Sequence, residues 1–291
     1  MKRAGLLLVD KPSGPTSHDT IASLRRLLRT RRVGHTGTLD PFATGLLVVP
    51  FGWATRLAEY LGGLPKSYHA VACLGVRTDT DDRTGRVLAS SEAWHEIDAD
   101  DVRRALGRQL GAIEQRPPDY SAKKVSGKPA YRLARSGEPA ELTPQRVTIH
   151  RLELLEFEPP RVSFEIECSS GTYVRAVARD LGETLGVGAH LEELRRTRIG
   201  PFRVEEAIRL DEETTEAEIE ARALPAAAAV GHLPRVDLDD READSLRHGR
   251  EIECDTLPRD GTVAVFVGDE LAAVAEARDG RLRPRKVFIA A

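Results

Sequence analysis

The chain has 291 residues, of which 41% are apolar, enough for a packed core, and this excludes a chain that is disordered throughout. Its 43 lysine and arginine residues nearly balance 46 aspartate and glutamate residues, so a uniformly basic tail protein is also excluded. No apolar run approaches the roughly 20 residues that cross a bilayer. The three cysteines, Cys73, Cys168 and Cys254, form no C-x-x-C pair typical of a disulfide framework or a thiolate zinc site. We expect a soluble, cytoplasmic protein with no membrane contact and about two domains.

The beginning of the chain predicts two buried strands separated by a helix and a long loop. Leu6–Val9 is a short apolar run typical of a buried strand. Ser17 is expected to cap the helix, because its hydroxyl can accept hydrogen bonds from the first free amides. Residues 34–45 are rich in glycine and threonine and predict a loop, and Leu46–Pro50 predicts the second strand. The helix carries apolar side chains at helical spacing: Ile21, Leu24, Leu27 and Leu28.

Short strands and helices follow in mixed order, which indicates an α+β fold. An acidic and then alanine-rich segment, residues 210–229, precedes a small β-rich unit, so we place a domain boundary near residue 232. The expected strands of the first part are Tyr68–Leu74, Thr148–Phe157 and Arg161–Cys168. The expected helices are Asp98–Leu110, ended by Pro117 and Pro118, and Tyr173–Leu185. The expected strands of the second part, Val236–Ile289, lie near Val263–Val267, Leu271–Ala277 and Val287–Ile289.

Charge is segregated along the chain although its net value is only -3. Residues 1–60 contain nine basic and four acidic side chains, and residues 116–151 contain eight basic and three acidic ones. Residues 204–222 contain two basic and eight acidic side chains. Such blocks favour one face suited to a polyanion and another that is acidic. Arginine-rich helices can equally be ordinary solvated faces, so charge alone leaves both interpretations open.

The loop at residues 34–45 combines three glycines with an acidic residue, Asp40, that precedes Pro41. The glycines allow close approach of the backbone to a ligand, and the proline disfavours a helical backbone at Asp40. The loop lacks the G-K-[ST] ending of a phosphate-binding loop. The loop does not have the residues of a metal site, since His35 is the only carboxylate or histidine near Asp40. From the residues alone, Asp40 is either a functional carboxylate or an ordinary turn residue.

Six segments in order along the chain resemble the TruB family of tRNA pseudouridine-55 synthases. Most specific is Gly34–Leu47, which reads G-H-T-G-T-L-D-P-F-A-T-G-L-L. The other segments are Asp10–Ser17, Tyr68–Asp82, Gln115–Lys124, Gly171–Gly182 and Gly188–Arg196. The resemblance covers about residues 5–203 densely, and the last fifty or so residues match a PUA-type RNA-binding extension mostly by position.

The resemblance implies a pseudouridine synthase catalytic domain over residues 1–232, with a central mixed, largely antiparallel sheet flanked by helices. It implies an RNA-clamp insertion at about residues 120–147 and a small β-rich, PUA-like RNA-binding domain over residues 233–291.

The implied reaction is an isomerisation in which uracil is detached from C1′ of its ribose, turned and rejoined through C5. Such a reaction needs no cofactor and no metal. This agrees with the sequence, which has no motif for a dinucleotide, a phosphate-binding loop or a metal. By resemblance Asp40 is the nucleophile, with attack on C1′ or on C6 of the base left open. The implied partner of Asp40 is Arg175, because a buried carboxylate needs a fixed positive charge to stay ionised. A guanidinium binds a carboxylate at two points, so lysine would be a poor substitute, whereas without the resemblance Arg175 would be an ordinary helix-surface arginine.

The resemblance assigns further residues to substrate binding. Tyr68 is implied to stack on the target base and to move a proton, and Tyr173 and Leu194 to line the uridine pocket. The target base is stacked in the T loop, so it must be flipped out, and His35 is implied to insert where it was. Lys11 is implied to support the wall of the active site. Without the resemblance, Tyr68 and Leu194 would be core residues and His35 a solvated loop residue.

The basic segment at residues 116–151 is then expected to act as the RNA clamp, because phosphate contacts fix register and give salt-dependent affinity. Its expected contacts are Lys123, Lys124, Lys128 and Arg132, and a charged loop without RNA contacts is the alternative. The expected partner is the T stem-loop of tRNA, with no required protein partner and a monomeric state.

Two other functions remain as alternatives. A catalytically silent RNA-binding or tRNA-folding protein would keep the clamp, but the presence of Asp40, Tyr68 and Arg175 disfavours it. A metal-free hydrolase using Asp40 and His35 would need a second acid or base at suitable spacing, and the sequence offers none.

Overall fold

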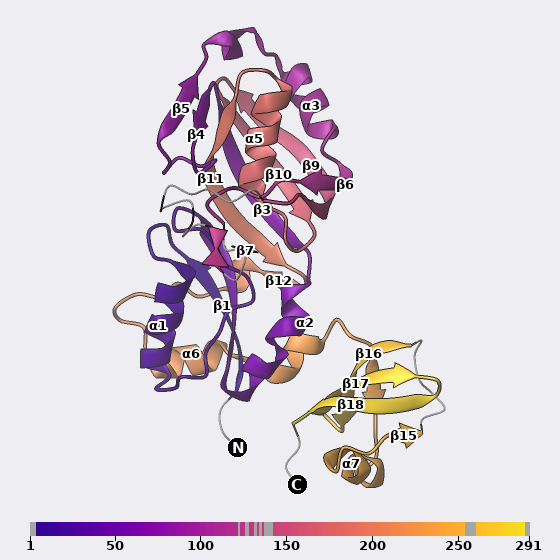
Figure 1. The fold of residues 1–291 in the computed structure, drawn as a ribbon. Coiled ribbons are helices and arrows are strands. Elements are labelled where there is room, and N and C mark those ends of the chain that lie inside the picture. Colours follow the sequence, from indigo (N-terminus) through magenta and orange to yellow (C-terminus); the bar gives the residue numbers. More distant parts are fainter. Residues whose placement is uncertain are drawn as a thin grey trace.

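The structure is a computed structural model that describes residues 4–121, 123–125, 128–130, 133, 136, 142–253 and 260–288, with only the backbone of residues 124–125, 128–129 and 240. Two sheets dominate the described residues (Figure 1). The larger has nine strands in the order β13-β1-β2-β11-β3-β10-β9-β6, with β12 paired to β11. Its strands are β1 (Gly5–Lys11), β2 (Thr44–Phe51), β3 (Lys66–Leu74), β6 (Gly111–Gln115), β9 (Gln145–Glu158), β10 (Arg161–Cys168), β11 (Ala189–Ile199), β12 (Phe202–Arg203) and β13 (Leu224–Pro225).

Pairing in the large sheet is antiparallel except between β2 and β11, which run parallel through Arg195↔Thr44 and Arg196↔Gly45. The expected mixed, largely antiparallel sheet flanked by helices is therefore confirmed. Two small hairpins lie beside it, β4 (Val76–Thr78) with β5 (Val87–Ser90), and β7 (Lys124–Val125) with β8 (Lys128–Pro129).

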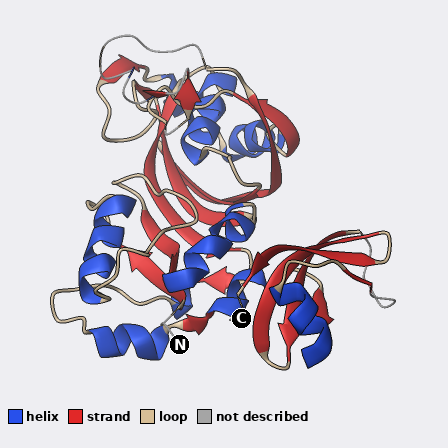
Figure 2. Ribbon diagram, turned by 60° about the horizontal axis from the view of Figure 1, so that its bottom comes forward, coloured by secondary structure: helices blue, strands red, loops and turns tan. Residues whose placement is uncertain are grey.

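One half of the large sheet curves around α3 (Ala99–Gly107) and α5 (Val174–Thr184), as Figure 2 shows. Alternate residues of β10 are buried there because side chains on a strand point to opposite faces in turn. Phe164 and Ile166 of β10 pack in one cluster with Val177 and Leu181 of α5. This core fixes the helix whose first turn carries Arg175.

The other half of the sheet is covered on both faces, which explains the uninterrupted apolar run of β1. Leu7 and Val9 pack with α1 (Ser17–Leu27) and α6 (Glu216–Arg222). Leu6 and Leu8 point the opposite way and pack with α2 (Ala58–Gly62) and with side chains of the C-terminal unit.

The C-terminal unit contains a five-stranded sheet in the order β14-β16-β17-β18-β15 and one helix, α7 (Asp240–Arg247). Its strands are β14 (Arg235–Asp237), β15 (Ile252–Glu253), β16 (Gly261–Val267), β17 (Glu270–Arg278) and β18 (Arg281–Val287). It meets the rest of the chain where the ring of Trp53 stacks on Phe288, with centroids 4.7 Å apart. Lys286 also pairs with Glu59 there.

Several local predictions are wrong, each for a physical reason. Thr16 caps α1, because it forms a reciprocal capping box with Asp19, whereas Ser17 is the first helical residue and contacts Leu39 instead. The third helix ends at Gly107, and β6 forms before the two prolines by pairing with β9. The last strand of the described residues, β18, begins at Arg281 and ends at Val287, whereas Ile289 of the predicted strand lies outside those residues. None of the helices in the described part of the chain has the length and apolar character that a bilayer crossing requires.

Candidate active site

The loop that carries Asp40 is held along its first part and at its middle. Its first part runs along β2, where the amides of Gly34 and Thr36 donate to Pro50 O at 3.1 Å and Val48 O at 3.3 Å. Its middle is fixed by Ser17, whose Oγ donates to Leu39 O at 3.1 Å and accepts from Leu39 N at 2.9 Å. These contacts fix the backbone immediately before Asp40.

A buried arginine of β11 holds the same loop from the other side. Arg196 is 1% exposed, and its Nε donates to Leu46 O at 2.7 Å while Nη2 donates to Gly37 O at 3.1 Å. Gly45 lies against the backbone of Arg196 with φ +103°, and a Cβ there would meet Arg196 O at 2.3 Å. Glycine is therefore required where the loop rejoins β2 beside β11.

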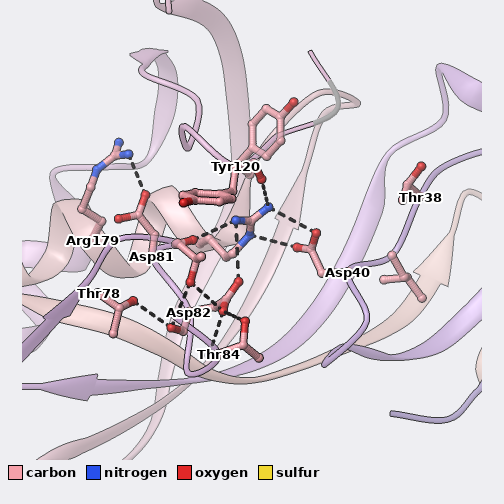
Figure 3. A network of polar contacts seen from close by, with 12 residues as sticks. Thr38, Asp40, Thr78, Asp81, Asp82, Thr84, Tyr120 and Arg179 are labelled. Atoms are coloured by element: carbon pink, nitrogen blue, oxygen red, sulfur yellow. Dashed lines mark hydrogen bonds and ion pairs between the residues drawn. The ribbon is translucent and has the colours of Figure 1, made fainter. Parts of the chain in front are cut away.

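Asp40 and Arg175 form a two-point ion pair (Figure 3). Arg175 Nε lies 2.9 Å from Asp40 Oδ2, and Nη2 donates to Oδ1 at 3.2 Å. The Arg175 side chain is 5% exposed, whereas that of Asp40 is 33% exposed. The guanidinium is thus buried behind a carboxylate that remains accessible, which corrects the interpretation of Arg175 as a helix-surface arginine.

The remaining N–H groups of Arg175 are bound by two other segments. Nη1 donates to Thr80 O at 2.8 Å, and Nη2 donates to Tyr120 O at 2.9 Å. Asp82 Oδ2 lies 3.6 Å from Nη1, so the cation lies between two carboxylates. Because so many acceptors surround it, the guanidinium is fixed in one orientation.

Asp82 ends one of the family-like segments but is not among the predicted site residues. It is 4% exposed, and its Oδ1 accepts from Thr80 Oγ1, from Thr84 N and from Thr84 Oγ1 at 2.6–2.9 Å. These donors saturate one oxygen and leave the other directed at Arg175 (Figure 3). Its signals in the sequence are its position at the end of the segment Tyr68–Asp82, which resembles the family, and the polar residues 79–85 around it.

A pocket of about 270 Å³ opens beside Asp40. Tyr68 and Leu194, each 8% exposed, come from neighbouring strands, and Tyr173 precedes the first turn of α5. Burial raises the pKa of the Tyr68 hydroxyl, so this group is neutral at physiological pH. The structure therefore brings together five of the predicted residues at one pocket: Asp40, Tyr68, Tyr173, Arg175 and Leu194.

Two lysines of the region are buried with their ammonium groups on backbone carbonyls. Lys11 Nζ donates to Pro12 O at 2.7 Å, to Pro15 O at 2.9 Å and to Pro41 O at 3.3 Å, so it joins β1 to the residue after Asp40. Lys66, which no sequence pattern singles out, lines the pocket and donates to Gly62 O and Leu64 O. Burial lowers the pKa of each lysine to about 8.

His35 does not line the pocket, although it lies five residues before Asp40. Its ring meets His18 edge-on at 5.5 Å, and its Nδ1 accepts from Gly37 N at 3.4 Å. Burial lowers the pKa of His35. A neutral ring with its Nδ1 occupied presents Nε2–H as a donor.

Only part of the predicted clamp falls within the described residues. Lys123 Nζ donates to Thr143 O at 2.9 Å. Lys124 and Lys128 lie in the β7–β8 hairpin, where the backbone alone is described, and Arg132 lies outside the described residues. Across the described ranges no group of three or more His, Cys, Asp and Glu side chains could hold a metal ion.

Three family models match consecutive parts of the chain. Residues 25–174 match the TruB family pseudouridylate synthase N-terminal domain, residues 175–239 the tRNA pseudouridylate synthase B C-terminal domain, and residues 233–289 the tRNA pseudouridine synthase II C-terminal model.

Relatives named tRNA pseudouridine synthase B match over most of their length. One from Symbiobacterium thermophilum is 50% identical over 84% of this chain and 82% of its own, and one from Thermobifida fusca is 46% identical over 98% of each.

Among solved structures, a Cbf5-Nop10-Gar1 complex contains a chain with TM-score 0.75 and 29% identity over 98% of this chain and 85% of that one. An H/ACA RNP bound to a substrate RNA containing 2′-deoxyuridine contains another, with TM-score 0.74 and 26% identity over the same shares. The family models together span nearly the whole chain, and the relatives match it at high identity over most of its length. The chain therefore belongs to the TruB family of pseudouridylate synthases.

Proposed function

We propose that this enzyme is a tRNA pseudouridine synthase that isomerises uridine 55 in the T loop of tRNA, with Asp40 as the nucleophile. The names of its relatives support tRNA as the substrate class. The observation that carries the catalytic assignment is the accessible Asp40 carboxylate paired with a buried Arg175 at the pocket wall. Family resemblance supports position 55 and the T loop.

The pocket supports a reaction on one extruded nucleotide. Its volume of about 270 Å³ lies below the roughly 300–1,000 Å³ of pockets for drug-sized ligands. Asp40 is the single carboxylate among the described residues that line it, so the paired carboxylates of an acid–base hydrolase are not at hand there.

Asp40 would attack C1′ or C6 of the base while the C1′–N1 bond breaks. The uracil then turns, C5 bonds to C1′, and the bond to Asp40 breaks so that the carboxylate is regenerated. C5 loses its proton and N1 gains one. Arg175 aligns Asp40, because a two-point ion pair fixes the plane of the carboxylate. No redox step enters this balance.

Three other pocket residues would hold the flipped uridine. The ring of Tyr68 offers a stacking surface, and its neutral hydroxyl can carry a proton. Tyr173 and Leu194 supply further wall. Outside the pocket, His35 would insert into the RNA where the target base was, and Lys11 would brace the turn after Asp40.

The clamp and the C-terminal unit would supply RNA contacts away from the reacting base. The clamp, at about residues 120–147, would bind phosphates through Lys123, Lys124, Lys128 and Arg132. A catalytic domain over residues 1–232 and a PUA-like RNA-binding domain over residues 233–291 are supported by a separate apolar core in the C-terminal sheet.

The deciding experiment incubates the purified chain with an unmodified tRNA transcript and no additives, followed by chemical mapping of isomerised uridine. Pseudouridine at position 55 alone is expected. Isomerisation at another position would contradict the site specificity, and no isomerisation would contradict the proposed function.

The matched variant is Asp40→Asn, which keeps the size and polarity of the side chain but removes the nucleophile. It should form no pseudouridine while binding the transcript with near-normal affinity. Turnover by this variant would contradict the nucleophile assignment, and loss of binding would show that Asp40 acts in RNA recognition.

A further inference from the structure

A second arginine of α5 lies one helical turn after Arg175 and faces the same two segments. Arg179 Nη1 pairs with Asp81 Oδ2 at 3.0 Å, and Nη2 donates to Arg116 O at 2.9 Å. Its Nε also donates to Asp180 Oδ1 at 2.9 Å. The Arg179 side chain is 14% exposed, and it is not among the residues that line the pocket.

Arg179 and Arg175 bind different residues of the same two segments. Residues 80–82, here called the Asp81 turn, give Thr80 O and Asp82 to Arg175 and Asp81 to Arg179. Residues 116–120, here called the clamp base, give Tyr120 O to Arg175 and Arg116 O to Arg179. Every acceptor of Arg175 other than Asp40 thus comes from a segment that Arg179 also holds. Figure 3 shows the contact of Arg179 with Asp81 beside this network.

The Asp81 turn has a backbone shape that needs support. Asp81 has φ +60°, a left-handed conformation that few residues other than glycine adopt. Its carbonyl accepts from Leu191 N at 2.9 Å, which ties the turn to β11, and its carboxylate is held by Arg179. Strained backbone of this kind persists where the surrounding contacts over-determine it.

We infer that Arg179 is a positioning residue for catalysis: it fixes the Asp81 turn and the clamp base, and through them the orientation of Arg175 against Asp40. The inference rests on the proposed function for its kinetic consequence. One planar guanidinium reaches a carboxylate and a carbonyl on different segments, whereas the single ammonium of lysine reaches only one of them in the same geometry.

The test compares Arg179→Gln, Arg179→Lys and Asp81→Asn with the original chain. Single-turnover pseudouridine formation should fall by about 10- to 100-fold in Arg179→Gln, because small misplacements of catalytic groups carry penalties of that order. The rate should fall less in Arg179→Lys and in Asp81→Asn, since in each variant the replaced side chain can still form one hydrogen bond to its partner. The dissociation constant for the transcript should change less than the rate does, because Arg179 is not among the residues that line the pocket.

The matched control is Arg161→Gln. Arg161 also pairs with two carboxylates, Glu192 at 2.8 Å and Glu193 at 2.9 Å, but on the exposed outer end of β10. Its removal should leave the single-turnover rate unchanged. If the single-turnover rate fell as far in Arg161→Gln as in Arg179→Gln, general destabilisation would explain the effect, and the inference would be overturned.

A readout independent of RNA is the NMR signal of the Arg175 Nε–H group, assigned by its loss in Arg175→Lys. In Arg179→Gln and Asp81→Asn this signal should shift and exchange faster with water, because Nε is the atom that faces Asp40 Oδ2. An unchanged signal in both variants overturns the inference, as does an unchanged rate. If the original chain forms no pseudouridine, the proposed function fails, and the NMR result alone decides whether Arg179 positions Arg175.

Discussion

Asp10 of β1 and Arg195 of β11 are joined across the intervening strand β2 by paired hydrogen bonds, Nη1 to Oδ1 and Nη2 to Oδ2, both at 2.9 Å. Asp10 is 7% exposed, and Arg209 contacts it from the surface at 3.3 Å. The residue after Arg195 is the buried arginine that holds the Asp40 loop. This pair therefore fixes the part of β11 that lines the pocket.

The first prediction concerns that pair. Arg195→Gln should lower the free energy of unfolding by about 1–3 kcal/mol at pH 7, because it leaves the buried Asp10 carboxylate without its two-point partner. Urea unfolding measures the change. Arg209→Gln is the control and should cost less than about 1 kcal/mol, since the Arg209 side chain is 81% exposed. Equal costs for the two variants would contradict the importance of the two-point contact.

The pH dependence of this effect follows from the pKa of Asp10. Burial alone would raise that pKa, but hydrogen bonds and charge from Arg195 and Arg209 outweigh it, so the pKa lies below its usual 3.8. A lowered pKa in the folded state gives stability that is present above pH 3.8 and is lost as the pH falls through the folded-state value. The difference between Arg195→Gln and the original chain should therefore shrink in urea titrations below pH 3.8.

The second prediction concerns Arg175→Lys. Lysine keeps the positive charge but cannot contact both oxygens of Asp40 together with Thr80 O and Tyr120 O. The single-turnover rate should fall at least 100-fold, roughly the penalty for losing an aligned donor at a reacting centre. A rate within a few-fold of the original would show that charge alone suffices. Transcript binding should be retained and serves as the control for folding.

The third prediction separates the ring of Tyr68 from its hydroxyl. Tyr68→Phe should bind the transcript normally but react more slowly, because it keeps the stacking face and loses the proton carrier. Tyr68→Leu should also weaken binding, since stacking contributes roughly 1–3 kcal/mol per base. Filter binding and single-turnover rates measure the two effects. An unchanged rate in Tyr68→Phe would leave Tyr68 as a stacking residue alone.

The fourth prediction concerns the basic clamp. Replacing Lys123, Lys124 and Lys128 by alanine should weaken transcript binding and reduce the slope of log affinity against log salt by roughly 1 for each phosphate that is no longer neutralised. Replacing Arg31 and Arg32 by alanine removes two positive charges at the other end of β2 from Asp40, outside the clamp, and should change the slope less. A salt slope unchanged by the lysine replacements would show that this segment does not bind phosphates.

The sequence alone predicted the elements in which buried residues recur at a regular interval. The strand Arg161–Cys168 has the bounds expected from its alternation, and the helix over residues 173–185 differs by only a residue at each end. The central strand β11 was not predicted, because Ala189–Ile199 is rich in charged residues and lacks such a period. Arg196 can be buried in it only because carbonyls of Leu46 and Gly37, far away in sequence, accept its N–H groups.

For the site, the sequence by itself determined the family and the types of residue that carry the chemistry, because motifs such as Gly34–Leu47 are local and specific. Only the tertiary structure decided how these residues meet. Asp40 and Arg175 are 135 positions apart, and the sheet order β2-β11-β3 together with the packing of α5 brings them into contact. The sheet also places Asp82, Lys66 and Arg179 around them. Contacts of this kind depend on long-range packing and hydrogen bonding, which no local period encodes.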